Sequence, residues 1–85
     1  MISKIFVIYD SKAEAYLPPF MMSSKGEAIR AFTDFANDGQ SMPSKHPEDF
    51  CLYEIGTWDD DTGSLVSIPM ESLGLAADFV RSKDG

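Results

Sequence analysis

Three consecutive aspartates, Asp59 to Asp61, form the densest group of potential metal ligands in the chain. Calcium and magnesium bind carboxylate oxygens, and they need at least about six oxygen ligands in a specific geometry. The ligand spacing of a calcium-binding loop is absent around these residues. We therefore predict that Asp59, Asp60 and Asp61 form a solvated hairpin turn rather than a cation site. The same run is a candidate surface for a basic partner.

The only histidine of the chain, His46, is close in sequence to two carboxylates, Glu48 and Asp49. A histidine beside a carboxylate is a starting point for acid–base chemistry or for a metal site. A zinc site needs further His or Cys ligands at a suitable spacing, and the chain has none. We interpret His46, Glu48 and Asp49 as a loop that leads into a strand, with a carboxylate accepting backbone N–H bonds. The same three residues are a candidate surface for a partner.

Cys51 is the single cysteine, and it lies in the apolar run 50–53. A chain with one cysteine has no internal disulfide, which fits a reducing cytosol. Free cysteine is commonly buried, so we expect Cys51 to be a small core residue. The chain also lacks a glycine-rich phosphate loop and a nucleophile–base pair with an oxyanion donor. We therefore expect a protein that is not an enzyme and that holds no cofactor and no metal.

Two apolar segments are candidates for contact with a partner protein. Trp58 lies beside the acidic turn near the end of a predicted strand, where it either caps the core or anchors an interface. Pro18, Pro19 and Phe20 lie in an extended segment that continues into two methionines. This soft apolar composition suits either the core or contact with another subunit.

The elements that must position these residues begin with a predicted hairpin. Residues 2–9 are β-branched and aromatic, which indicates a strand, and a polar turn follows at residues 10–14. Residues 15–22 return as a second strand. Pro18 and Pro19 remove two backbone donors from it, so we place it at the edge of the sheet.

The clearest helix signal covers residues 25–37. Ser24 is the predicted N-cap, and Glu27 three residues later is expected to complete a capping box with it. Gly39 follows the last turn, where a left-handed residue ends a helix. The apolar face of this helix is expected to pack on the sheet, and it consists of Ala28, Ala31, Phe32, Phe35 and Ala36.

Residues 40–47 form a long connection, which Pro43 and Pro47 keep from being a helix interior or a central strand. Residues 50–58 carry apolar side chains at both odd and even positions, which indicates a central strand. The turn that follows ends at Gly63, which supplies a positive φ.

A fourth strand is expected at residues 64–68, and Pro69 is expected to end it. Residues 71–79 predict a weak C-terminal helix, because Gly74 lowers its helix propensity by about 1 kcal/mol relative to alanine. The predicted fold is α+β, a mostly antiparallel four-stranded sheet in the order β-β-α-β-β with one main helix on one face. We expect one domain at residues 1–80 and a flexible polar tail at 81–85.

The charge balance limits the partners that the chain is expected to bind. Fourteen acidic residues outnumber seven lysines and arginines, which gives a net charge of −7. Nucleic acids are bound mainly by basic residues that neutralise phosphates, so direct DNA binding is disfavoured. The apolar run 5–8 is far too short for a signal peptide or a membrane span, so we expect no membrane contact.

The landmarks of the chain, taken in order, resemble the small nonstructural protein of gokushovirus-type microviruses, which are single-stranded DNA phages. The resemblance runs from about residue 5 to about residue 77, and the joint order of short motifs carries it. These motifs are Tyr9-Asp10, Pro18-Pro19-Phe20, Ala28-Ile29-Arg30-Ala31-Phe32, His46-Pro47-Glu48-Asp49, Leu52-Tyr53 and Asp60-Asp61-Thr62-Gly63.

The resemblance implies a protein of the host bacterial cytoplasm that is not part of the virion. It implies a role in viral genome replication, in the switch from duplex replication to single-strand synthesis and packaging. The expected partner is a phage replication or packaging protein or a host replication factor, and homo-oligomers are also expected because the core is thin. Two alternatives are an acidic DNA mimic that blocks a host DNA-binding protein, and direct binding of single-stranded DNA on exposed aromatics such as Tyr16, Phe20, Tyr53 and Trp58.

Overall fold

The computed structural model describes residues 1–81, and the rest of the predicted polar tail, residues 82–85, lies outside the described residues. The strands and helices are β1 (Ile2–Asp10), β2 (Ala15–Tyr16), β3 (Phe20–Met22), α1 (Lys25–Asn37), α2 (Met42–Lys45), β4 (Phe50–Asp59) and β5 (Ser64–Leu75). Short 3₁₀ turns cover Pro47–Asp49 and Ala76–Phe79. The predicted α+β fold is confirmed.

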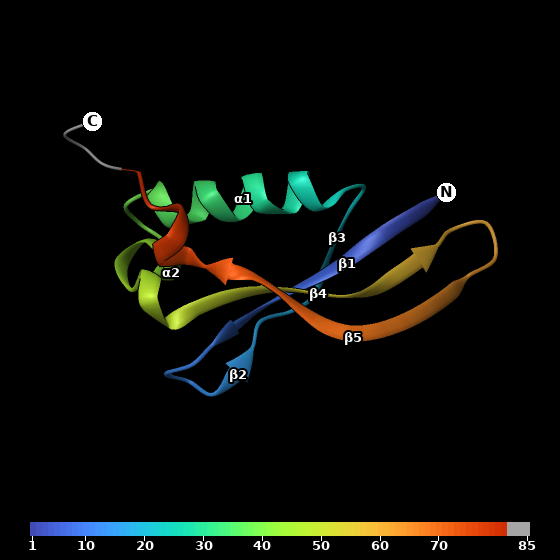
Figure 1. Ribbon diagram of the computed structural model, residues 1–85, viewed down its shortest axis with the longest axis horizontal. Coiled ribbons are helices and arrows are strands. Elements are labelled where there is room, and N and C mark those ends of the chain that lie inside the picture. Colours follow the sequence, from blue (N-terminus) through green and yellow to red (C-terminus); the bar gives the residue numbers. More distant parts are fainter. Residues whose placement is uncertain (82–85) are drawn as a thin grey trace.

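All strands pair antiparallel in one sheet, in the order β2-β1-β4-β5, with β3 paired to β1 beside β2 (Figure 1). The predicted edge position of residues 15–22 and the central position of β4 are confirmed. The sheet has five strands rather than four, because Pro18 and Pro19 divide the second predicted strand into β2 and β3.

Helix α1 has the predicted bounds and lies across one face of the sheet (Figure 1). The hydroxyl oxygen of Ser24 accepts the backbone N–H of Glu27 at 3.2 Å, as expected of an N-cap. The predicted return bond from Glu27 to the Ser24 backbone is wrong. The Glu27 carboxylate instead accepts the hydroxyl of Ser23 at 2.8 Å, so a neighbouring serine anchors the first turn.

The core lies between α1 and the sheet. Its largest fully buried side chains are Phe6 from β1, Phe32 from α1 and Leu52 from β4. Burying such side chains stabilises a fold by about 1.5–3 kcal/mol each. The expectation that Phe35 shares this core is wrong, because 46% of Phe35 is exposed and its position on the helix turns it away from the buried stripe.

Two expectations based on prolines are wrong. The connection after α1 contains the short helix α2, because Pro43 lies in its first turn, where backbone N–H groups have no helical partner. Pro69 does not end the fourth strand, and β5 continues to Leu75. Residues 68–70 have no partner in the register between β4 and β5, so Pro69 lies in a bulge and removes no ladder bond.

The predicted C-terminal helix at residues 71–79 is likewise wrong over most of its length, because residues 71–75 belong to β5 and only the 3₁₀ turn Ala76–Phe79 is helical. Gly74 has a φ of 130°, a conformation that helices exclude, and the ring of Phe79 packs where a Cβ atom would be.

The sheet is much longer than the helix that covers it. The molecule measures 47 × 28 × 19 Å, whereas a helix of 13 residues is about 20 Å long. The turn of the β4–β5 hairpin and the N-terminus therefore extend beyond α1 (Figure 1). The other face of the sheet has no helix against it in the described residues.

β4 and β5 approach each other closely at Gly56, and a substitution there tests this packing. A Cβ atom at this position would clash with the carbonyl oxygen of Val66 and lie 3.3 Å from the Cα atom of Ser67. We expect Gly56→Ala to lower the free energy of unfolding by about 1–3 kcal/mol, because the backbone must move. Denaturant unfolding followed by circular dichroism measures the change.

Gly26 is the matched control, because a Cβ atom there meets only the Ser24 hydroxyl, at 3.9 Å. We expect Gly26→Ala in helix α1 to raise the free energy of unfolding by about 0.4–1 kcal/mol. Equal effects of the two substitutions would contradict the packing at Gly56.

Candidate protein-contact surface

The register of the strands assigns each side chain to one face of the sheet, because residues paired across strands point to the same side. Phe6, Leu52 and their neighbours face α1. The charged side chains of the three long strands lie on this same side, and they are Lys4, Asp10, Glu54, Asp59 and Glu71. The helix-covered face therefore carries both the core and the strand charges.

Glu54 is the most buried of these charges, with 4% of the residue exposed. The ammonium group of Lys4 lies 3.3 Å from its Oε2 atom, and that of Lys25 lies 3.7 Å from its Oε1 atom. Lys25 also pairs with Glu71 at 3.3 Å. This network, which sequence reasoning missed, offsets the cost of burying a carboxylate and occupies two of the seven basic side chains.

The opposite face, which we call the open face, is uncharged in the described strands. The residues that the register places there are Ser3, Ile5, Val7, Tyr9, Tyr16, Met21, Cys51, Tyr53, Trp58, Leu65, Ser67, Ser72 and Leu75. Ile55 is unpaired in a bulge between Glu54 and Gly56, and it lines a hollow together with Val7 and Ser67. A hydrogen bond to Cys51 raises the pKa of Tyr53 above its ordinary value, with further contributions from Cys51 electrostatics and from desolvation, so the phenol adds no charge to this face at pH 7.

Cys51 belongs to this open face and not to the core, so its expected role as a core residue is wrong. It is only partly buried, and its Sγ atom lies 3.4 Å from the hydroxyl of Ser72 on β5. The alternation along β4 explains the difference: Phe50 and Leu52 face the helix, and the residue between them must face away.

A hollow of about 660 Å³ lies on the open face, and we call it the groove. Its lining residues are Val7, Tyr16, Leu17, Pro18, Pro19, Ile55, Ser67, Ile68 and Met70. The hydroxyl of Tyr16 reaches the sulfur of Met70 at 4.0 Å, so the two walls meet at one point. Both of these residues are about half exposed, at 54% and 48%.

The predicted partner residues Pro18 and Pro19 therefore lie in a wall of the groove. Pro18 also borders a second apolar hollow of about 430 Å³, which lies between β3 and α1. Phe20 and Met22 of β3 and Phe35 of α1 line this hollow. Trp58 is on the open face too, paired with Ser3 and Leu65, but at the far end near the hairpin turn and outside the groove lining.

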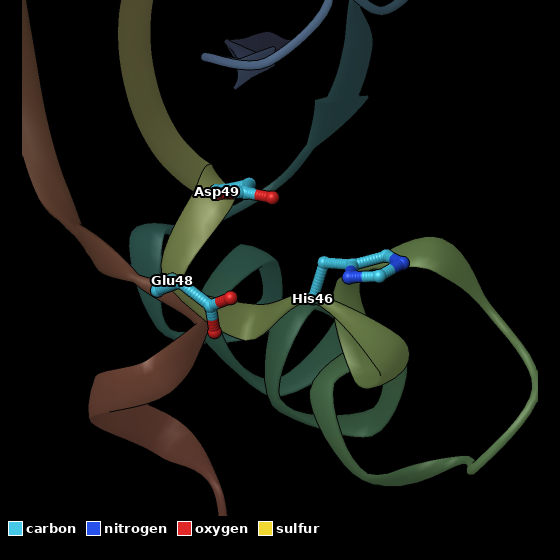
Figure 2. A group of neighbouring side chains, drawn as sticks. All are labelled: His46, Glu48 and Asp49. Atoms are coloured by element: carbon cyan, nitrogen blue, oxygen red, sulfur yellow. The ribbon is translucent and has the colours of Figure 1, made fainter.

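His46, Glu48 and Asp49 lie where the chain passes from α2 into β4, on separate parts of the turn (Figure 2). Their potential ligand atoms are within 4.8 Å of one another, but His46 and Glu48 are exposed to solvent. The expected carboxylate bonds to the backbone are wrong. The main-chain carbonyl of Asp49 accepts the N–H of Ser11 at 2.9 Å, and that of His46 accepts the N–H of Asp49 at 3.0 Å.

Asp60 and Asp61 lie in the predicted hairpin turn, with Gly63 at a φ of 72°, whereas Asp59 is the last residue of β4. Sequence reasoning missed their partner. The α-ammonium group of Met1 lies 2.7 Å from Asp60 and 2.8 Å from Asp61, because β1 starts beside the end of β4. The backbone N–H of Asp61 and the Met1 charge hold the pKa of Asp59 below its ordinary value.

The three predicted groups are thus distributed along the molecule. The acidic turn and Trp58 lie at one end, the His46 turn lies toward the other, and Pro18 and Pro19 lie between them. No helix in the described part of the chain is long and apolar enough to cross a membrane.

The sheet with one helix-covered face and one uncharged face defines a small acidic α+β protein with an apolar groove on its uncharged face. Residues 3–79 match the family model described as Phage ORF5 protein, and the chain belongs to this family. Protein ORF5 of Chlamydia phage 1 is 36% identical over 67 residues, which cover 74% of this chain and 70% of that protein. The resemblance to the small gokushovirus protein is confirmed. No solved structure matches the chain.

The contacts of the acidic turn are expected to change the pKa of the Met1 ammonium group. Hydrogen bonds to Asp60 and Asp61 raise the pKa of this amine above 8.0. Its stabilising contribution is therefore complete below pH 8 and is lost as the pH rises through the raised pKa. We expect Asp60→Asn to lower that pKa, measured from the pH dependence of acylation of the α-amine.

Asp34→Asn is the control for this titration, because it removes the same charge from the exposed side of α1, where Asp34 lies 3.9 Å from Arg81. We expect it to leave the pKa of Met1 unchanged. A similar shift in both variants would mean that net charge, and not the hydrogen bond, sets the pKa of the amine.

The paired lysines and the uncharged open face predict weak contact with DNA. We expect no measurable binding of a labelled single-stranded oligonucleotide to the purified chain, even at low salt, because its phosphates find no basic stripe. Fluorescence anisotropy at low and moderate salt measures this. Binding at low salt that disappears at moderate salt would instead identify DNA as a direct ligand.

Proposed function

We propose that this protein is a non-enzymatic phage accessory factor that acts in viral genome replication by binding another protein. The single observation that carries the proposal is the uncharged open face with its apolar groove. Tyrosine, tryptophan and methionine are enriched in the centres of protein interfaces, and all three are present on this face. Membership of the Phage ORF5 family supports the phage context.

The charges support a protein partner over a nucleic acid. Lys4, Lys25 and Arg81 each lie within ion-pair distance of a carboxylate, and the chain as a whole is at −7. A surface that binds phosphates by releasing counterions needs basic side chains that face the ligand. The side chains that face outward from the open face are aromatic, aliphatic or hydroxyl-bearing instead.

The step that we assign to the protein is the change from duplex replication to single-strand synthesis and packaging in the cytoplasm of the host bacterium. The partner in this step is a phage replication or packaging protein or a host replication factor. The protein acts by contact alone in this proposal, because the open face brings together no nucleophile and base.

Disruption of the gene in a phage that carries this protein tests the proposal. We expect less single-stranded progeny DNA for each duplex replicative form, measured by hybridisation after gel separation, and we expect plasmid-borne expression of the chain to restore the ratio. Purified virions should lack the chain by mass spectrometry. An unchanged ratio of the two DNA forms would overturn the proposed role.

A further inference from the structure

The groove has the composition of a site for an apolar anchor. Val7 and Ile55 form its floor, and the walls come from residues 16–19 on one side and from Ser67, Ile68 and Met70 on the other. Leu17, Tyr16 and Met70 in these walls are 39–54% exposed, so a partner that covers them removes apolar surface from water. The register places no charged side chain on this face in the described strands. A partner that covers the face therefore does not remove a charged strand side chain from water.

The exposed Glu14 lies two residues before Tyr16 in one wall. Glu71 directly follows Met70 in the other wall, but it points to the helix-covered face, where it pairs with Lys25. Lys4 on β1 and Lys25 on α1 are held on that face by Glu54 as well. The groove is therefore an uncharged site within a strongly negative molecule.

This charge distribution separates three possible occupants. A second copy brings another net charge of −7 toward the first, which opposes association at low salt. A nucleic acid strand is repelled for the same reason. A protein segment with lysine or arginine beside its apolar anchor is attracted by the net negative charge of the molecule, and its basic residues remain in solvent beside the groove.

We propose that the groove receives an apolar segment of another protein that carries basic residues beside its anchoring side chains. This inference rests on the proposed function and specifies the chemistry of the partner. It predicts that the apolar anchor supplies most of the affinity and that the basic residues make association depend on salt.

The experiment begins with a library of random displayed peptides selected against the full purified chain. We expect the enriched peptides to combine an apolar centre with basic flanks. One enriched peptide is then synthesised in three forms, which are the selected sequence, a form with glutamates in place of the basic residues, and a form with serines in place of the apolar centre. Anisotropy should show the tightest binding for the first form, weakened several-fold between about 50 and 300 mM salt, weaker binding of the glutamate form and no binding of the serine form.

Two variants of the chain locate the contact. Met70→Glu alters the wall of the groove, and Val66→Glu alters an exposed residue on the helix-covered side of the same strand. Both make the chain more acidic by one charge, so an interaction governed by charge alone would strengthen in both. We expect Met70→Glu to weaken peptide binding at least about tenfold and Val66→Glu to change it by less than about twofold.

Circular dichroism and light scattering accompany these measurements. A folded Met70→Glu variant that binds as well as the wild type would overturn the inference, and so would enrichment of acidic or uncharged flanks. A dimer that Met70→Glu converts to a folded monomer would also overturn it, because a second copy would then occupy the groove. A changed ratio of phage DNA forms without peptide binding would leave the proposed function intact and remove only this inference.

Discussion

The pairing of β1 with β4 along their full length is the interaction on which the rest of the structure depends. It sets which side chains point toward α1. Ile55 is unpaired in a bulge of β4, and this register shift keeps Phe6 paired with Glu54 on the helix-covered face. Because neighbouring residues of a strand alternate between faces, this pairing separates the strand charges from the uncharged side chains. The single main helix covers one face, and the other face is left uncharged and without a helix in the described residues.

The same constraint explains how a carboxylate comes to be buried in a small protein. Glu54 follows Phe50 and Leu52 on the helix-covered side, and it reaches that side beyond the apolar part of the core. There the first turn of α1 supplies Lys25 and the neighbouring strand supplies Lys4. The network needs both the pairing of β1 with β4 and the position of α1 over the sheet. The sequence of one strand or of the helix alone therefore does not predict it.

The sequence predicts the elements with strong local signals well. The periodicity and the Ser24 cap fix α1, and the continuous apolar runs fix β1 and β4 as neighbours of the core. The failures involve Pro43 and Pro69, because a proline is excluded from an element only where its missing N–H would have had a partner. That condition depends on the first turn of a helix or a bulge in a ladder, and a single sequence does not specify either one.

The candidate site was predictable only in part, for a similar reason. Pro18 and Pro19 stood out as an irregular edge, and they do line the groove. The opposite wall, which consists of Ser67, Ile68 and Met70, lies about fifty positions further along the chain, and most of it belongs to a bulge that the sequence does not predict. The floor residues Val7 and Ile55 are apolar like core residues. The register places Val7 on the open face, and Ile55, which is unpaired in the bulge of β4, lines the groove beside it.

The bulge in β5 has a consequence for the behaviour of the chain at high concentration. β5 is a twelve-residue strand at the edge of the sheet, and a long regular edge is a template onto which a strand of another molecule can add. Pro69 and its neighbours divide this edge into two short arms, residues 64–67 and 71–75, that do not continue one ladder. The irregularity that contributes to one wall of the groove thus also opposes fibril-like growth along the sheet.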